Sequence, residues 1–252
     1  MKLIKSKKLK KFKNINHGFF NKTGGKSSGI YKSLNCGLGS EDKKKNVLKN
    51  LKIVKNKIGC KKNNIIILHQ IHSKKFYYIN KLPAKKLIGD GLVTKKRKIA
   101  LSILTADCAP ILIYDKHIKM IGAAHAGWKG AYKKIIINIL KYFFRKGSKK
   151  ENIIVVIGPC IAQKNYEIKN DFIKKFINQD KSNSIYFKKI KKRTFFSLKD
   201  YLKDQIKGLG IKNIEIINKD TYNIKNKFFS SRRSLHNKHN DYGRNITTIM
   251  IK

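Results

Sequence analysis

The sequence predicts one domain of mixed α and β structure, in the α/β or α+β class. Short apolar runs rich in β-branched residues alternate along the chain with amphipathic segments, as strands and helices on a shared core do. With 252 residues and 41% hydrophobic content, the chain can close a large core. No linker rich in Pro, Gly and Ser divides it. We therefore interpret 1–252 as a single domain.

Six apolar segments are predicted to form buried strands. They are 65–68, 99–104, 111–114, 121–124, 153–157 and 214–217. The basic segment 1–16 is expected to be an edge strand or flexible. It lacks the apolar stretch of a signal peptide, and no run approaches the roughly 20 apolar residues of a membrane span. A cytoplasmic protein with no membrane partner is therefore expected.

Four helices are predicted from amphipathic spacing and end signals. The first is expected to begin at Ser40, which Glu41 and Asp42 follow, and to stop at Gly59. Its apolar stripe consists of Val47, Leu48, Leu51, Val54 and Ile58. The other helices are expected over 131–144, 171–178 and 197–208, the last with a start that resembles a capping box.

The formal charge of +46 is the most extreme feature of the composition. Only six of the 60 basic residues are Arg, and Lys recurs throughout with Asn and Ile. Specific nucleic-acid contacts favour Arg for bidentate recognition, so we interpret the charge as compositional drift and expect no specific nucleic-acid partner. A basic nucleic-acid-binding protein is kept as the non-enzyme alternative.

Metal-capable side chains follow three of the predicted strands, in segments 68–72, 105–110 and 123–128. On a continued strand, His69 and His72 would point to opposite sides, so only one of them is expected to be a ligand. Cys108 and His125 are the other candidates. The four cysteines are too few and too scattered for a disulfide scaffold, which leaves reduced thiols. Two imidazoles and a thiolate suit zinc, and three protein ligands leave one position open for catalysis.

Five ordered motifs resemble the laccase-domain, YfiH-like family, whose members are also called polyphenol oxidases or peptidoglycan editing factors. The motifs are His69–His72, Gly89–Thr94, Thr105–Cys108, Ala124–Trp128 and Ile157–Ile161. The resemblance implies an α+β fold, a single-domain mixed α/β/β/α sandwich. It also implies a zinc-dependent purine nucleoside phosphorylase, with inorganic phosphate as co-substrate and with adenosine deaminase activity. The expected nucleosides are adenosine, inosine, guanosine and methylthioadenosine.

The same resemblance places zinc, rather than copper, on His72, Cys108 and His125. Cys108 and His125 are thus expected to be catalytic, as is Asp107, which could orient a ligand or move a proton. The candidate phosphate or ribose contacts are Lys22, Lys129, Arg232, Arg233 and Arg244. The chain departs from the family at Lys22 and Lys129, where Arg is usual, which keeps the charge but loses the planar fork. We expect a monomer or a homodimer.

Two other enzyme classes compete with this prediction. A cysteine hydrolase, or an enzyme that edits cell-wall precursors, could use Cys108 and His125 as nucleophile and base. A multicopper oxidase is disfavoured, because the chain has seven His and no His-x-His pair.

Overall fold

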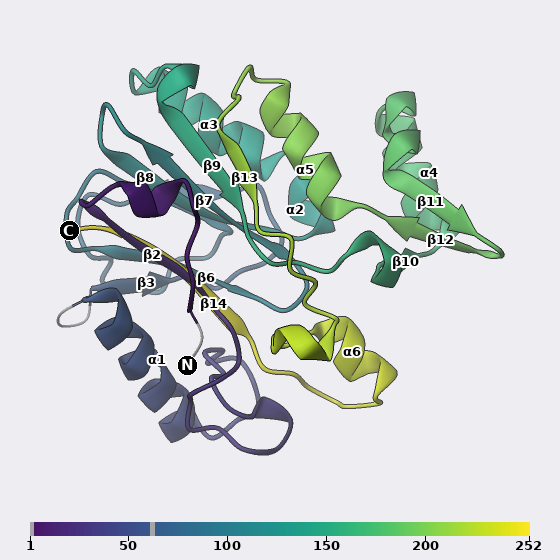
Figure 1. Ribbon diagram of the computed structural model, residues 1–252, viewed down its shortest axis with the longest axis horizontal. Coiled ribbons are helices and arrows are strands. Elements are labelled where there is room, and N and C mark those ends of the chain that lie inside the picture. Colours follow the sequence, from purple (N-terminus) through teal and green to yellow (C-terminus); the bar gives the residue numbers. More distant parts are fainter. Residues whose placement is uncertain (1–2, 61–63) are drawn as a thin grey trace.

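The computed structural model describes residues 3–60 and 64–252, and it has four main layers in the order helix, sheet, sheet, helix (Figure 1). The first sheet is ordered β1 (Leu3–Ile4), β2 (Ile15–Phe20), β14 (Asn245–Ile251), β6 (Ala100–Thr105) and β3 (Ile65–Ile67). The second is ordered β13 (Ile214–Ile216), β9 (Ile153–Ile157), β7 (Ala109–Asp115), β8 (Met120–Ala126), β5 (Gly91–Thr94) and β4 (Phe76–Tyr78). The predicted α/β/β/α fold is confirmed.

Six helices and a small third sheet complete the described chain. The helices are α1 (Lys44–Ile58), α2 (Trp128–Tyr132), α3 (Ile135–Arg145), α4 (Asn170–Gln179), α5 (Leu198–Lys207) and α6 (Ser231–His236), besides short 3-10 turns. The third sheet is ordered β10 (Glu167–Ile168), β12 (Arg193–Phe196) and β11 (Phe187–Ile190). Helix α1 covers the first sheet, whereas α2, α3 and α5 cover the second (Figure 1).

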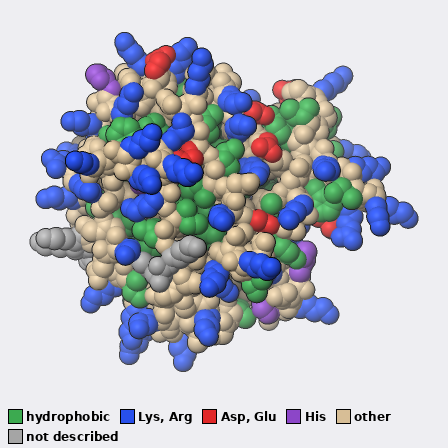
Figure 2. Space-filling model, in the orientation of Figure 1, with side chains coloured by type: hydrophobic (Ala, Val, Ile, Leu, Met, Phe, Trp, Pro, Cys, Tyr) green, Lys and Arg blue, Asp and Glu red, His purple; other side chains and the backbone are tan. Residues whose placement is uncertain are grey.

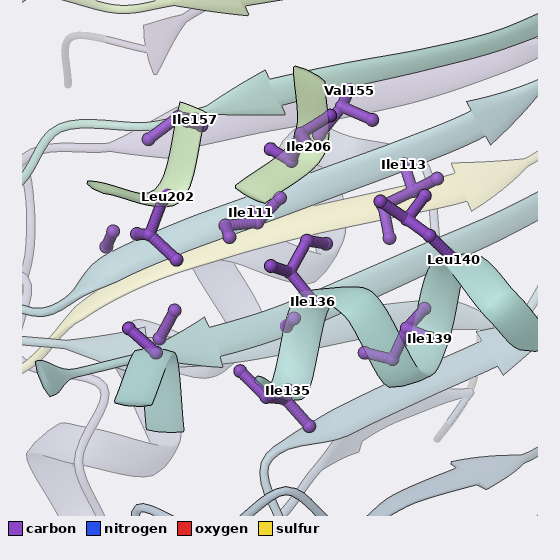
Figure 3. Packing of buried hydrophobic residues seen from close by; sticks show 14 of the residues in the cluster. Ile111, Ile113, Ile135, Ile136, Ile139, Leu140, Val155, Ile157, Leu202 and Ile206 are labelled. Carbon is purple, nitrogen blue, oxygen red and sulfur yellow. The ribbon is translucent and has the colours of Figure 1, made fainter. Parts of the chain in front are cut away.

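Strand alternation produces these layers, because successive side chains point to opposite faces of a sheet. In β7, Ile111 and Ile113 pack under α3 and α5, as Figure 3 shows, whereas Leu112 and Tyr114 pack against the first sheet. Both faces of the central strands are therefore apolar. This explains why the predicted strands are near-continuous apolar runs, and all six are confirmed to within about two residues at their ends.

The first helix starts later than predicted. It begins at Lys44, because the Ser40 hydroxyl donates to the Gly37 carbonyl and Asp42 accepts from the Ser27 hydroxyl, which holds this segment in a loop. Gly59, in the left-handed region, ends the helix as expected. The prediction for Leu48 was also wrong, since its side chain is 55% exposed.

The helix predicted over 131–144 is two helices, since Lys134 has a positive φ of 62° and separates α2 from α3. The break lets α2 follow the turn out of β8 while α3 lies along the second sheet. Helices α4 and α5 confirm the predictions for 171–178 and 197–208. Leu3–Ile4 forms an edge strand on β2, and residues 1–2 of the predicted N-terminal segment lie outside the described residues.

Lys and Arg side chains are spread over the face of the molecule in Figure 2 and do not gather in one area. Among the described residues, no helix is both long and apolar enough to cross a bilayer.

Candidate metal centre

His72, Cys108 and His125 meet at one end of the two stacked sheets. Their ligand atoms all lie within 4.8 Å of one another, and Cys108 Sγ is 3.7 Å from His72 Nε2. His72 follows β3, Cys108 lies where the chain passes from β6 in the first sheet to β7 in the second, and His125 lies within β8. Both sheets therefore build the site. No other group of this kind occurs in the part of the chain that the structure describes.

His125 and His72 differ from the predicted placement at strand ends. His125 is inside β8 and buried, because β8 extends to Ala126. His72 lies five residues beyond the end of β3, with a positive φ of 57°. His69 lines the neighbouring cavity but does not belong to the ligand group. The turn after β3, rather than strand alternation, thus separates the two histidines.

Asp90 is a residue of the site to which the sequence reasoning gave no role. It directly precedes β5 and is fully buried. Its Oδ1 lies 2.8 Å from His125 Nδ1, and Oδ1 and Oδ2 also accept the N–H groups of His72 and Ser73. Burial would raise the pKa of Asp90, but the bonds from His125 and Ser73 outweigh it and lower the pKa to about 2. In the sequence, the Gly89–Thr94 motif, which contains Asp90, was the feature that could have indicated a role for this residue.

Cys108 and His125 polarise each other. Burial would raise the pKa of Cys108, but the charge of His125 and hydrogen bonds from both histidines lower that pKa to about 6. Burial would lower the pKa of His125, but Cys108 and Asp90 raise that pKa to about 9. Without a metal, the pairing therefore favours the charged forms, a thiolate on Cys108 and an imidazolium on His125. A thiolate is the form of cysteine that binds metals.

A cavity of about 610 Å³ opens beside this group. The apolar part of its lining includes Leu38, Leu48, Leu51, Ile65, Ile67, Leu68 and Leu104. The polar lining includes His69, Lys55, Lys86, Tyr242 and Arg244 besides the three candidate ligands. Gln70 also borders the cavity, but its amide bonds both backbone groups of Leu104, at 2.7 and 2.8 Å, and so extends the strand pairing. The volume lies in the range of small-molecule sites.

Arg244 is the one residue among the five candidate substrate contacts that lines this cavity. Its guanidinium lies 4.5 Å from the centre of the Tyr242 ring, and its Nη1 donates to Asp241 and to the Tyr242 carbonyl. These contacts fix the guanidinium before any ligand binds.

The other four candidates do not line this cavity. Arg233 donates to the backbone carbonyls of three residues, Thr221, Tyr222 and Phe228. Arg232 donates to the Glu167 carbonyl and lies over Tyr166. Lys22 lies over Phe229, and Lys129 over Trp128. Of the five candidates, the structure therefore places only Arg244 at this cavity.

Asp107 is buried next to Cys108 and binds the segment that leads into α6. Its carboxylate accepts from the Thr221 and Ser230 hydroxyls, at 2.7 and 2.9 Å, and from the Arg232 N–H, at 2.7 Å. Burial raises the pKa of Asp107 despite these bonds. The positive φ of 88° at Asp107 shapes the turn that carries Cys108.

Fold and site together define an α/β/β/α protein with a His–Cys–His group that could hold a metal ion beside a cavity. The model of the family described as multi-copper polyphenol oxidoreductase laccase matches residues 16–252. The chain belongs to this family, as its motifs predicted.

Relatives and solved structures agree with this assignment. A Rickettsia conorii protein named purine nucleoside phosphorylase is 36% identical over 83% of this chain and 88% of its own length. A Rickettsia prowazekii protein of the same name is 34% identical over 89% and 91%. The crystal structure of Bacillus licheniformis hypothetical protein YfiH superposes with a TM-score of 0.87 at 28% identity, over 94% of this chain and 93% of that one.

Proposed function

We propose that the protein is a zinc-dependent purine nucleoside phosphorylase that also deaminates adenosine. Its substrates would be adenosine, inosine, guanosine and methylthioadenosine, with inorganic phosphate as the second substrate. The observation that carries the proposal is the His–Cys–His group beside a cavity of about 610 Å³. The names of the two Rickettsia relatives support the substrate class.

The donor set supports zinc. Two imidazole nitrogens and a thiolate are ligands that zinc accepts, and zinc sites with three protein ligands keep an open position for substrate. A copper electron-transfer site can share these ligands, but it carries a weak axial ligand instead of an open cavity. Here the three ligands line the cavity. Zinc would supply a concentrated positive charge that stabilises negative charge developing on the substrate.

In phosphorolysis, a phosphate oxygen bonds to the anomeric carbon while the glycosidic C–N bond breaks and the purine leaves with the electron pair and gains a proton. We assign phosphate binding to Arg244, whose fixed guanidinium can donate to an anion from its remaining N–H groups. The apolar lining, which includes Leu48 and Leu104, suits the face of the purine ring. In deamination of adenosine, water would instead add to purine C6 and the bond from C6 to the exocyclic nitrogen would break, so that inosine and ammonia are released.

Cys108, His125 and Asp107 have different roles at this site. Cys108 and His125 hold the metal, and both face the cavity. Asp107 acts through Cys108, because its bonds to Thr221 and Ser230 hold the turn that carries the thiolate.

Product analysis tests the proposal directly. Purified, metal-analysed protein is incubated with inosine and with adenosine, each with and without phosphate. We expect hypoxanthine and ribose 1-phosphate from inosine only when phosphate is present, and inosine and ammonia from adenosine without phosphate. Zinc-loaded protein that releases no purine base in phosphate would refute the phosphorylase, and a lack of ammonia would refute the deaminase.

A cysteine hydrolase, including one that acts on cell-wall precursors, is the second candidate function. The lowered pKa of Cys108 beside His125 favours it, because such a pair resembles a nucleophile with its base. The two proposals differ in metal dependence. Chelation of the metal would abolish the phosphorylase but leave a cysteine hydrolase active.

A further inference from the structure

We propose that Asp90 is a positioning residue with two effects. It fixes which ring nitrogen of His125 faces the metal, and it holds the backbone of His72 in the conformation that brings the His72 side chain to the metal. Asp90 does not belong to the His–Cys–His group, and its carboxylate lies behind both histidines. The inference rests on the proposed metal site and extends it to a residue with no assigned role.

The carboxylate of Asp90 joins two elements that are far apart in the sequence. Oδ1 accepts from His125 Nδ1 at 2.8 Å and from the His72 N–H at 3.0 Å. Oδ2 accepts from the Ser73 N–H at 2.6 Å, the Ser73 hydroxyl at 2.7 Å and the Ile71 N–H at 3.4 Å. One buried carboxylate therefore binds β8 and the turn after β3 together.

The backbone of Asp90 makes the same connection. Its carbonyl accepts the His125 N–H at 2.7 Å, and its N–H donates to the Lys75 carbonyl at 2.8 Å. Backbone and side chain thus hold the residue in one place relative to both histidines. A shift of Asp90 would move both of them.

The contact with His125 determines its tautomer. An ionised carboxylate only accepts hydrogen bonds, so the nitrogen that faces it, Nδ1, must carry the proton. Nε2 is then the nitrogen left for Cys108 and a metal. The pairing also raises the basicity of the ligand, as carboxylates behind metal-bound histidines do.

The contact with the turn explains the backbone of His72. Successive N–H groups of Ile71, His72 and Ser73 converge on one carboxylate, and His72 takes the left-handed conformation with φ 57°. That conformation is unfavourable for a residue with a Cβ, so it persists only where surrounding bonds hold it. It places His72 Nε2 at 3.7 Å from Cys108 Sγ.

The Asp90→Asn substitution tests the hydrogen bonds of Asp90 and not the size of its side chain, because asparagine and aspartate have nearly the same shape. Asparagine offers one acceptor oxygen and one NH₂ group, so it cannot accept from His125 and from the Ser73 side of the turn at once. We expect zinc affinity, measured by competition with a chelator, to fall about 10-fold to 100-fold. We also expect the visible spectrum of the Co²⁺-loaded variant to change in band position and intensity, which a loss of stability alone would not cause.

Asp115→Asn is the matched control. Asp115 is another fully buried aspartate, at the opposite end of the β7–β8 pair, where its Oδ1 accepts the N–H groups of His117 and Ile118. We expect this variant to lose thermal stability while zinc affinity and the Co²⁺ spectrum stay at wild-type values. Asp90→Asn with wild-type affinity and an unchanged Co²⁺ spectrum would overturn the proposal.

A measurement on the wild-type chain keeps the proposal testable even if Asp90→Asn does not fold. In a long-range ¹⁵N–¹H spectrum of zinc-loaded protein with ¹⁵N-labelled histidine, His125 should show a protonated Nδ1 and a metal-bound Nε2. Coordination through Nδ1 would overturn the role of Asp90. Failure of the wild-type chain to bind zinc or Co²⁺ would instead refute the metal site of the proposed function.

Discussion

Gly127 lies directly against Cys108: a Cβ at position 127 would be 2.7 Å from Cys108 Sγ and 2.7 Å from a ring carbon of His72. The φ of Gly127 is −74°, which any residue can adopt, so backbone conformation does not require glycine here. Glycine is required because a side chain at position 127 would collide with Cys108 and His72.

Gly127→Ala should therefore displace the ligands with little cost to the fold. We expect zinc affinity to fall about tenfold or more, as for other disturbances around metal ligands, while the melting temperature of the metal-free protein changes little. Chelator competition and thermal unfolding measure the two quantities. Gly208→Ala is the control, since a Cβ there meets only ordinary contacts at the end of α5. Equal zinc affinity in the two variants would contradict the argument.

Cys108→Ala should remove zinc and both nucleoside activities together. The substitution deletes one of three protein ligands and a negative charge, which weakens zinc binding. Turnover should fall with it, because both activities depend on the bound zinc. Metal analysis and product assays are the measurements. Cys160→Ala, at a buried cysteine of the core, should cost about 1 kcal/mol of stability and keep both properties. Retained zinc with lost activity in Cys108→Ala would favour the cysteine hydrolase.

Alkylation of the metal-free protein should select Cys108 at low pH. Its pKa is lowered to about 6, so the reactive thiolate is present above pH 6 and disappears as the pH falls below that value. Burial raises the pKa of the other three cysteines. The iodoacetamide rate at Cys108, followed by mass spectrometry, should have its midpoint near pH 6, and zinc should suppress it. A midpoint near that of an ordinary thiol would count against the thiolate–imidazolium pair.

Arg244 and Arg233 should respond differently to substitution. Arg244→Lys removes the planar fork beside the cavity, so we expect the KM for phosphate to rise about tenfold, or ~1.4 kcal/mol. It also loses bonds to Asp241 and the Tyr242 carbonyl, so some loss of stability accompanies the change in KM. Arg233→Lys breaks bonds to backbone carbonyls, so the main expected effect is a loss of about 3 kcal/mol of stability. Initial rates against phosphate and chemical denaturation distinguish the two. An unchanged KM for phosphate in Arg244→Lys would remove Arg244 from the proposed phosphate site.

Binding to DNA should be weak and should disappear between low and physiological salt. The Lys and Arg side chains are spread over the visible face, so contacts with phosphates would be purely electrostatic (Figure 2). Fluorescence anisotropy with two unrelated duplexes at several salt concentrations is the measurement. Tight, sequence-selective binding at physiological salt would show that the charge has a specific function.

The sequence by itself determined six of the eleven strands in the two main sheets of the described chain, those whose residues form near-continuous apolar runs. Runs such as 153–157 are apolar at every position because both faces of the strand are buried, and this pattern is local. Strand β14 was missed because buried polar side chains interrupt its apolar pattern. The Thr248 hydroxyl, for example, is satisfied by Ser102 across the sheet. The end of α1 at Gly59 was also predictable, whereas its start depended on side-chain bonds from distant residues.

Only the tertiary structure decided which polar residues form the site. Cys108 and His72 are 36 positions apart, and they meet because strands of two different sheets end at the same place. Arg233 and Arg244 look alike in the sequence, yet one bonds backbone carbonyls and the other lines the cavity. The sequence supplies the chemical types and their order along the chain. The packing of one sheet on the other determines the distances between them. The Gly89–Thr94 motif drew attention to the segment of Asp90, but only its hydrogen bonds to His72 and His125 show what Asp90 does.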